Sequence, residues 1–453
     1  MSEASLLYFL LAVSFFAIVT VPLYQYLIRR RRDLFEPIYV ATFLFLVMFW
    51  FRSVYILVWG SDLLGDPPFP PDILRAWNIS WLYLLLAIAL FYGFYYSRLG
   101  VGVARAFAPL PSQWRLGRAY AAIWLLFAVG LAALFTLMRQ FGSLTSYLFQ
   151  KSEVFSTLGT GPLVLFGQCV ALSMQVAYAV LLRRRSRGAW VIFILVALPA
   201  VAAQAVQGMK GAFLLLLFSL LILRHYVVRP IRLRLVLLFA VAGIFLVFPA
   251  LTALREASDV VSYQQEWAYY VDPGRALDIA AQRLSGIEAL VFIVRDTPQV
   301  MNYQLGKTYL GVLVSWIPRE LWPDKPVLGF GQIFTPLYLG HVFAPEGTTY
   351  APTIFGEAYV NFHVAGIILV AVLGGVFLRA FYQYLIIRNG NLSGIVVYAV
   401  TLPYVLVGLE AHSVAWLTTG WLFLVSRGLS VFVAKRTFGS RHALATRIMR
   451  AER

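Results

Sequence analysis

Long apolar runs recur along the whole of this sequence, and they constrain the fold more than any other feature. A helical run of about 20 apolar residues crosses the hydrocarbon core of a bilayer. Of the 453 residues, 61% are hydrophobic and only 13% are charged, whereas a soluble domain carries about 25% charged residues. The sequence therefore predicts an all-α polytopic membrane protein, and it excludes a secreted soluble domain behind a signal peptide.

We predict about eleven transmembrane helices from the apolar runs. Chain order divides them into two groups, with eight helices in residues 1–253 and three in residues 351–433. The expected spans are residues 5–28, 36–60, 77–97, 119–140, 161–182, 189–207, 211–228, 235–253, 364–386, 393–411 and 414–433.

Basic residues predict the orientation of these spans. Most of the 37 Lys and Arg residues follow odd-numbered spans, as in the run 29–32 and in the tail 434–453. Lys and Arg collect in cytoplasmic loops, so we expect an external N-terminus and a cytoplasmic C-terminus. The net charge of +17 is then an insertion signal, and no nucleic-acid partner is expected.

Residues 254–350 depart from the pattern of helix after helix. A connection of this length is usually functional or disordered, and its many aromatic residues argue against disorder. We expect an ordered extracytoplasmic segment with an amphipathic helix that lies on the membrane or packs on the bundle. Its apolar stripe is formed by Leu277, Ala280, Leu284, Ile287, Val291 and Val294.

Several kinds of chemistry find no support in the motifs. The sequence has no phosphate-binding loop, no dinucleotide fingerprint and no HExxH pair. Cys169 is the one cysteine, and the five histidines never reach metal-ligand spacing. We therefore expect no metal and no cofactor.

Cations near the predicted outer leaflet are the first candidates for function. Arg52 interrupts an apolar span and Lys210 lies in a glycine turn. A charge at membrane depth costs free energy, and one that is present usually has a functional role. Arg and Lys can hold a lipid diphosphate and stabilise it as a leaving group. The alternative is that many of them pair with nearby carboxylates such as Glu256, Glu288 and Asp296. The cations of the large segment are Arg255, Arg275, Arg283, Arg295, Lys307, Arg319 and Lys325.

Two short stretches are more specific. Three prolines make residues 317–326 a rigid, non-helical loop, which would present Arg319, Trp322 and Lys325 to a sugar and its phosphates. In residues 356–362, a helix would place Glu357 and Asn361 on one face.

Glu357 could then act as a general base. The alternative is that Glu357 has no catalytic role and is a carboxylate near a helix start, where the helix dipole favours negative charge. His363 and His412 could also serve as bases at the outer face, but interfacial hydrogen bonding is the favoured explanation for both.

Together these motifs resemble those of bacterial O-antigen and oligosaccharide repeat-unit polymerases of the Wzy type. The resemblance covers residues 208–211 and 283–375. Its motifs are Arg283-x-x-Gly286, Gly306-x-x-Tyr309, the PRxxWPxKP stretch at 318–326, Thr-Thr-Tyr-Ala-Pro-Thr at 348–353 and Gly356-Glu357-x-Tyr359-x-Asn361-Phe362.

The resemblance implies a metal-independent, inverting glycosyltransferase with a GT-C-like fold. Such enzymes move a growing glycan from one undecaprenyl-diphosphate carrier to a new lipid-linked repeat unit at the periplasmic face, often with a Wzz-type co-polymerase that regulates chain length. On this basis the expected catalytic residues are Glu357, Arg283 and Arg319. The expected substrate- and diphosphate-binding residues are Lys210, Arg255, Lys325, Trp322, Tyr359 and Asn361.

Two other functions stay open from the sequence. An O-antigen ligase uses the same donor but gives the glycan to the lipid A core. A flippase for lipid-linked sugars needs ionisable residues through the depth of the bundle, whereas here they become sparse at mid-membrane, apart from Arg52 and Arg139.

Overall fold

The computed structural model describes most of the chain. It covers residues 3–28, 33–60, 64, 67–140, 160–206, 210–243, 245, 272, 274, 286–314, 317, 322, 329–343 and 351–435. Within these ranges all regular elements are helices, and the one β-contact is an isolated bridge between Trp114 and Ala434. The predicted all-α fold is confirmed.

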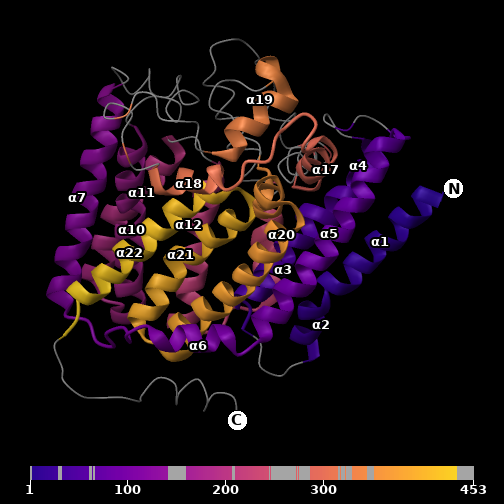
Figure 1. Cartoon of the computed structure of the whole chain (residues 1–453). Coiled ribbons are helices and arrows are strands. Elements are labelled where there is room, and N and C mark those ends of the chain that lie inside the picture. The colour runs from indigo at the N-terminus through magenta and orange to yellow at the C-terminus, as the bar shows by residue number, and fades with distance from the viewer. Residues whose placement is uncertain are drawn as a thin grey trace.

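The helices form a bundle whose long members run between two ends (Figure 1). The first half contains α1 (Glu3–Val19), α2 (Val21–Ile28), α3 (Pro37–Phe45), the π-helix η1 (Leu46–Phe51), α4 (Arg52–Trp59), α5 (Pro71–Tyr96), α6 (Leu99–Ala106), α7 (Leu116–Gln140), α10 (Thr160–Arg184), α11 (Arg187–Val206), α12 (Lys210–Val227) and α13 (Leu233–Ala242). The second half contains α17 (Gly286–Asp296), α18 (Lys307–Val314), α19 (Phe330–Phe343), α20 (Thr353–Tyr382), the π-helix η3 (Gln383–Arg388), α21 (Leu392–Glu410), the 3-10 turn η4 (Ser413–Ala415) and α22 (Trp416–Phe432).

Nine helical segments among the described residues are long and apolar enough to cross a membrane. They correspond to nine of the predicted spans, and a tenth prediction matches the shorter apolar helix Gly211–Val227. The remaining prediction, 235–253, begins in α13, and most of its second half lies outside the described residues.

One boundary differs clearly from the prediction, because α5 begins at Pro71 and not at residue 77. Proline suits the first turn of a helix, since its missing N–H would have no partner there. Asp72 and Arg75 interrupt the apolar run, so hydropathy alone does not reveal this first part of the helix.

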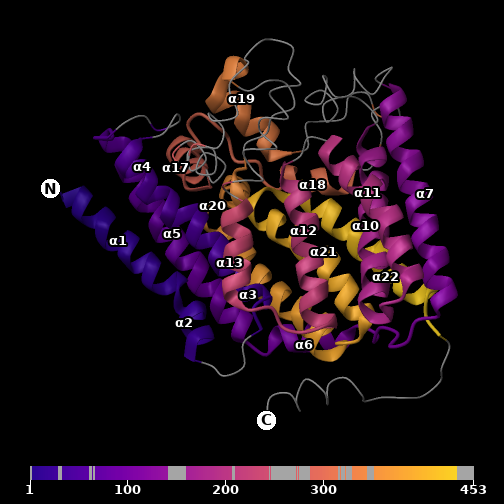
Figure 2. The same cartoon turned by 180° about the vertical axis from the view of Figure 1, so that it is seen from behind.

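The two ends of the bundle carry different elements. Helix α6 lies at one end, whereas α17, α18 and α19 lie at the opposite end (Figure 1). The view from behind shows the same division, with α13 beside the long helices (Figure 2). The orientation stays a prediction. Below, cytoplasmic end is the name for the end with α6, and outer end is the name for the end with α17, α18 and α19.

The amphipathic helix predicted in the large segment packs on the bundle. The structure describes its second half as α17, in which all residues except Arg295 are buried. Helix α17 contacts α5, α20 and η1, and the ring centroids of Phe292 and of Tyr338 on α19 lie 4.9 Å apart, with the ring planes tilted by 40°. The first half of the stripe, residues 277–284, lies outside the described residues.

A buried ion pair fixes α17 to the start of α4. Arg52 Nε and Nη2 donate to the two carboxylate oxygens of Glu288 at 2.8 and 2.9 Å, and both residues are almost completely buried. Planar, bidentate contact of this kind is the strongest geometry for an Arg–carboxylate pair. The structure thus gives Arg52, the charge that interrupts a span, a structural partner.

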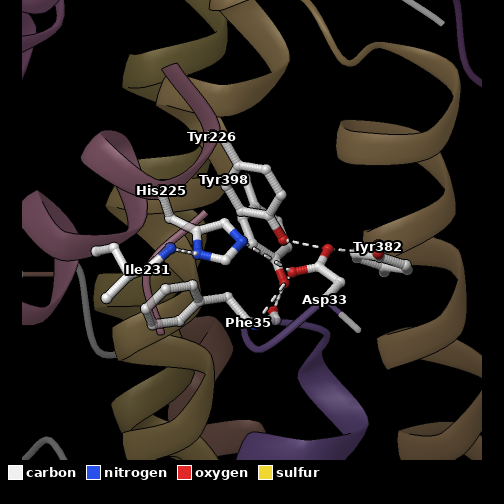
Figure 3. Close-up of polar contacts among 7 residues, drawn as sticks. All are labelled: Asp33, Phe35, His225, Tyr226, Ile231, Tyr382 and Tyr398. Carbon is white, nitrogen blue, oxygen red and sulfur yellow. Dashed lines mark hydrogen bonds and ion pairs between the residues drawn. The ribbon is translucent and has the colours of Figure 1, made fainter. Parts of the chain in front are cut away.

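A second polar cluster ties several helices together at the cytoplasmic end (Figure 3). The Asp33 carboxylate accepts hydrogen bonds from Tyr226 at 2.6 Å and from Tyr382 at 2.5 Å. His225 Nε2 lies 3.5 Å from the same carboxylate, and its Nδ1 accepts the N–H of Ile231. The Tyr398 hydroxyl donates to the carbonyl of Phe35.

This cluster joins the connection after α2 to the ends of α12 and α20 and to the start of α21. Three helices from both halves of the chain therefore meet one short connection at this carboxylate and its neighbours.

Helix α20 breaks sharply near its first third. Phe362 and His363 have non-helical backbone angles, so that Thr353–Asn361 forms a separate helical piece. The two pieces approach so closely that a β carbon at Gly366 would lie 2.1 Å from the carbonyl oxygen of Ala358. Only glycine fits there. The break separates the predicted motif at 356–362 from the predicted span at 364–386.

Candidate functional site

Glu357 is buried on the short first piece of α20. Its Oε1 accepts the Ser413 hydroxyl at 2.7 Å, and its Oε2 accepts the Ser413 backbone N–H at 2.6 Å. Ser413 begins η4, directly before α22, so the carboxylate lies at the N-terminal end of a helical segment. Negative charge is favourable in this position. One carboxylate thus joins two membrane helices at the outer end.

The Ser413 hydroxyl has a second acceptor within reach. Its Oγ lies 3.4 Å from the carbonyl oxygen of Thr308. A rotation about one bond would move the hydroxyl toward Thr308 and leave Glu357 Oε1 open, while the backbone N–H of Ser413 still held Oε2.

Asn361 shares the Glu357 face of the helix, as the spacing predicted. Its Oδ1 accepts the Gly306 N–H at 2.7 Å, and its Nδ2 donates to Thr308 Oγ1 and to the Glu357 carbonyl. Gly306 has a φ of +89°, which glycine adopts without strain. Asn361 is fully buried and its donors and acceptor are occupied, so it holds the turn before α18 against α20.

Two buried polar atoms near this face have no hydrogen-bond partner among the described residues: the Tyr309 hydroxyl and His412 Nδ1. Tyr309 lies on α18, and His412 directly precedes Ser413. Burial raises the pKa of Tyr309, and the nearby Glu357 charge adds to that rise, so the phenol stays a donor. Burial lowers the pKa of His412 to about 4, so its imidazole is neutral near pH 7. A buried polar atom without a partner is costly, so a bound ligand that satisfied these atoms would gain affinity.

Tyr359 faces away from Glu357. Its ring lies 5.6 Å from that of Tyr83 on α5 and 4.8 Å from that of His363. The structure therefore places Glu357 with Asn361 and Tyr359 on different sides of the same helical piece.

The other predicted site residues are placed only in part. Trp322 is exposed and lies outside any helix. The three prolines of its loop lie outside the described residues, so the rigid loop stays a prediction. Lys210 begins α12, but its side chain is not described. Arg255, Arg283, Arg319 and Lys325 lie outside the described residues, so their gathering around a diphosphate stays a prediction.

Arg295, also a cation of the large segment, pairs with the next residue. Its Nε and Nη2 donate to Asp296 at 2.6 and 2.9 Å, and Asp72 lies 3.9 Å away. The hydrogen bond to Asp296 raises the pKa of Arg295. For this residue the structure supports the alternative that it pairs with a carboxylate. No group of three or more potential metal-ligating side chains occurs within the described part of the chain.

A family comparison identifies the segment that contains this site. Residues 328–414 match the family model described as "Putative O-antigen polymerase". The match supports the resemblance over the region that includes Glu357, Asn361, His412 and Ser413. No curated protein and no solved structure matches this chain.

Sequence reasoning missed Ser413, Thr308 and Tyr309 as neighbours of Glu357. Ser413 lies 56 positions from Glu357 along the chain, and no periodicity links them. The one available signal for Tyr309 was its place in the Gly306-x-x-Tyr309 motif.

Proposed function

We propose that this chain is an O-antigen polymerase. It would transfer a growing glycan from one undecaprenyl-diphosphate carrier to a new lipid-linked repeat unit, at the periplasmic face of a bacterial inner membrane. The observation that carries this proposal is the family match over residues 328–414, which encloses the buried Glu357–Ser413 contact at the predicted outer end of the bundle.

The proposed reaction is a direct displacement at the anomeric carbon. A hydroxyl oxygen of the acceptor sugar forms the new glycosidic bond while the bond to the diphosphate oxygen breaks. Glu357 accepts the hydroxyl proton, and the lipid diphosphate leaves with the bonding electrons. An inverted configuration follows from a single displacement, and none of these steps requires a metal or a Wzz-type partner.

Two features of the geometry support Glu357 as the base. Its Oε1 becomes available when the Ser413 hydroxyl turns toward Thr308, and the acceptor hydroxyl would then replace that hydroxyl. The Tyr309 phenol, which the Glu357 charge reaches, and the imidazole of His412, the residue before Ser413, each have a polar atom without a partner among the described residues, and both suit the oxygens of a sugar.

The cations predicted from the sequence complete the proposal. Arg283 and Arg319 would stabilise the leaving diphosphate, with Lys210, Arg255 and Lys325 as further contacts. Trp322 would offer an aromatic face to a sugar ring.

The decisive experiment uses purified full-length protein in lipid nanodiscs. Given undecaprenyl-diphosphate repeat units without nucleotide, it should produce a ladder of glycans that differ by one repeat unit. A single product formed only when the lipid A core is added would indicate a ligase instead. Movement of unextended repeat units across sealed vesicles, without any ladder, would indicate a flippase.

A further inference from the structure

His363 has a backbone conformation that residues with a side chain rarely adopt. Its φ is +53° and its ψ is −145°, close to a region that glycine alone populates readily. Strained residues persist where the surrounding structure holds them in place, and they gather at ligand sites. Glycine would form the break in α20 without this strain, so the presence of an imidazole needs a reason.

Aromatic rings from three elements surround this imidazole. His363 lies 4.8 Å from the ring of Tyr359, 5.9 Å from Tyr303 and 6.3 Å from Tyr83. Tyr83 comes from α5, and Tyr303 comes from the turn that donates the Gln304 N–H to the Val360 carbonyl at the break. The hydroxyl of Tyr359 interacts with both other tyrosines. The structure thus collects three phenols around one strained histidine.

The cluster is open on the histidine side. Tyr359 is buried and Tyr83 and Tyr303 are half-buried, whereas His363 itself is exposed. An exposed imidazole offers a donor and an acceptor to a ligand, and the tyrosine rings offer apolar faces with polar edges.

This combination fits a sugar ring better than a lipid chain. The apolar C–H face of a pyranose can lie on an aromatic ring while its hydroxyl groups bond to phenol and imidazole. A hydrocarbon chain would cover the exposed His363 imidazole without satisfying its polar atoms, which is unfavourable.

We propose that His363, with Tyr83, Tyr303 and Tyr359, binds one sugar ring of the lipid-linked glycan at the break in α20. The choice of ligand rests on the proposed function. This glycan site is separate from the Glu357 face, because Tyr359 and Glu357 point to different sides of the helix.

The test exploits the strain, because a glycine at position 363 should improve folding and impair binding. Wild type and His363→Gly are titrated with three probes: the free repeat-unit oligosaccharide, its undecaprenyl-diphosphate form and undecaprenyl phosphate without sugar. We expect a higher melting temperature for His363→Gly, about tenfold weaker binding of the oligosaccharide and unchanged binding of undecaprenyl phosphate.

Arg185→Gly is the matched control. Arg185 also has a positive φ, of 52°, and it is exposed in the turn after α10 at the cytoplasmic end. Relief of strain there should raise the melting temperature and leave oligosaccharide binding unchanged.

Tyr303→Phe removes a single hydroxyl and leaves the backbone intact. We expect it to weaken oligosaccharide binding by about two- to tenfold. If His363→Gly fails to fold, Tyr303→Phe still tests whether this cluster binds a sugar ring.

The outcomes separate this site from the proposed function. Wild-type affinity for the oligosaccharide in both His363→Gly and Tyr303→Phe would overturn the glycan site. An equal loss of undecaprenyl phosphate binding would overturn it in favour of a lipid site. Binding that depends on His363 without any glycan ladder from wild type would retain the site and reject the polymerase.

Discussion

At the residue scale, the two oxygens of the Glu357 carboxylate differ in the kind of donor that Ser413 offers them. Its Oε2 receives a backbone N–H that no side-chain change at Ser413 removes, whereas its Oε1 receives a hydroxyl that can turn away. If Glu357 is purely structural, it needs both hydrogen bonds from Ser413. If it is a general base, one of its oxygens must become free to take up a proton. Substitutions at the two residues can therefore distinguish these roles.

Glu357→Gln and Ser413→Ala should differ strongly in activity. The glutamine amide cannot take up the proton of the attacking sugar hydroxyl, so we expect Glu357→Gln to slow polymerisation by about 10²–10⁴-fold. Ser413→Ala keeps the backbone N–H and leaves Oε1 open, and we expect a rate within about tenfold of wild type. Rates are measured from the glycan ladder with equal amounts of folded protein, and a wild-type rate for Glu357→Gln would remove Glu357 from the chemistry.

His412 should make stability depend on pH. Its pKa falls from 6.5 in a model peptide to about 4 in the folded protein through burial, so the unfolded state binds the proton more readily. The contribution of neutral His412 is therefore complete above pH 6.5 and is lost as the pH falls toward 4. It amounts to about 3.5 kcal/mol at most, since one pKa unit corresponds to about 1.4 kcal/mol.

Thermal unfolding from pH 7.5 to 4.5 checks this expectation. His412→Leu should flatten the decline that wild type shows below pH 6.5. His225→Leu, at the opposite end of the bundle, is the comparison variant. Identical slopes for wild type and His412→Leu would show that other groups control the response.

At the scale of single elements, α17 depends on the Arg52–Glu288 pair. The helix is buried on nearly all sides, so its hydrophobic contacts alone do not select one position along α4 and η1. The bidentate contact between two buried charges does so, because any shift would leave both charges without compensation.

Replacement of either Arg52 or Glu288 alone should lower the free energy of unfolding much more than replacement of both. Arg52→Leu or Glu288→Leu alone leaves a buried charge, and we expect each to destabilise the protein by about 3–5 kcal/mol. The double variant should lie close to wild type, since well-packed apolar residues often replace a buried ion pair at little cost. Unfolding in mixed micelles gives these free energies, and additive losses in the double variant would contradict the pairing.

At the scale of the whole molecule, the bundle has two ends with different organisation. The outer end contains α17, α18 and α19 above the broken helix α20 (Figure 1). The cytoplasmic end is held by the Asp33 cluster, in which side chains from α12, α20 and α21 converge on one connection (Figure 3).

Cysteine labelling in intact cells tests the predicted orientation. In a Cys169→Ala background, Asn302→Cys should react with a membrane-impermeant thiol reagent, because Asn302 is exposed at the predicted outer end. Ser186→Cys, exposed between α10 and α11, should react only after the cells are opened. The reverse pattern would place the Glu357 face in the cytoplasm and would contradict the proposed polymerase.

The sequence by itself determined the class of the molecule, the approximate positions of its spans and the helical face shared by Glu357 and Asn361. These features follow from hydropathy and from the 3.6-residue helical period, which act over a few turns of chain. Only the tertiary structure decided the contacts of Arg52 with Glu288 and of Glu357 with Ser413, which join residues 236 and 56 positions apart. It also decided the break at His363, because that conformation is unfavourable locally and is held by the turn, α5 and the close approach at Gly366. Local patterns cannot report interactions whose free energy appears only when distant segments meet.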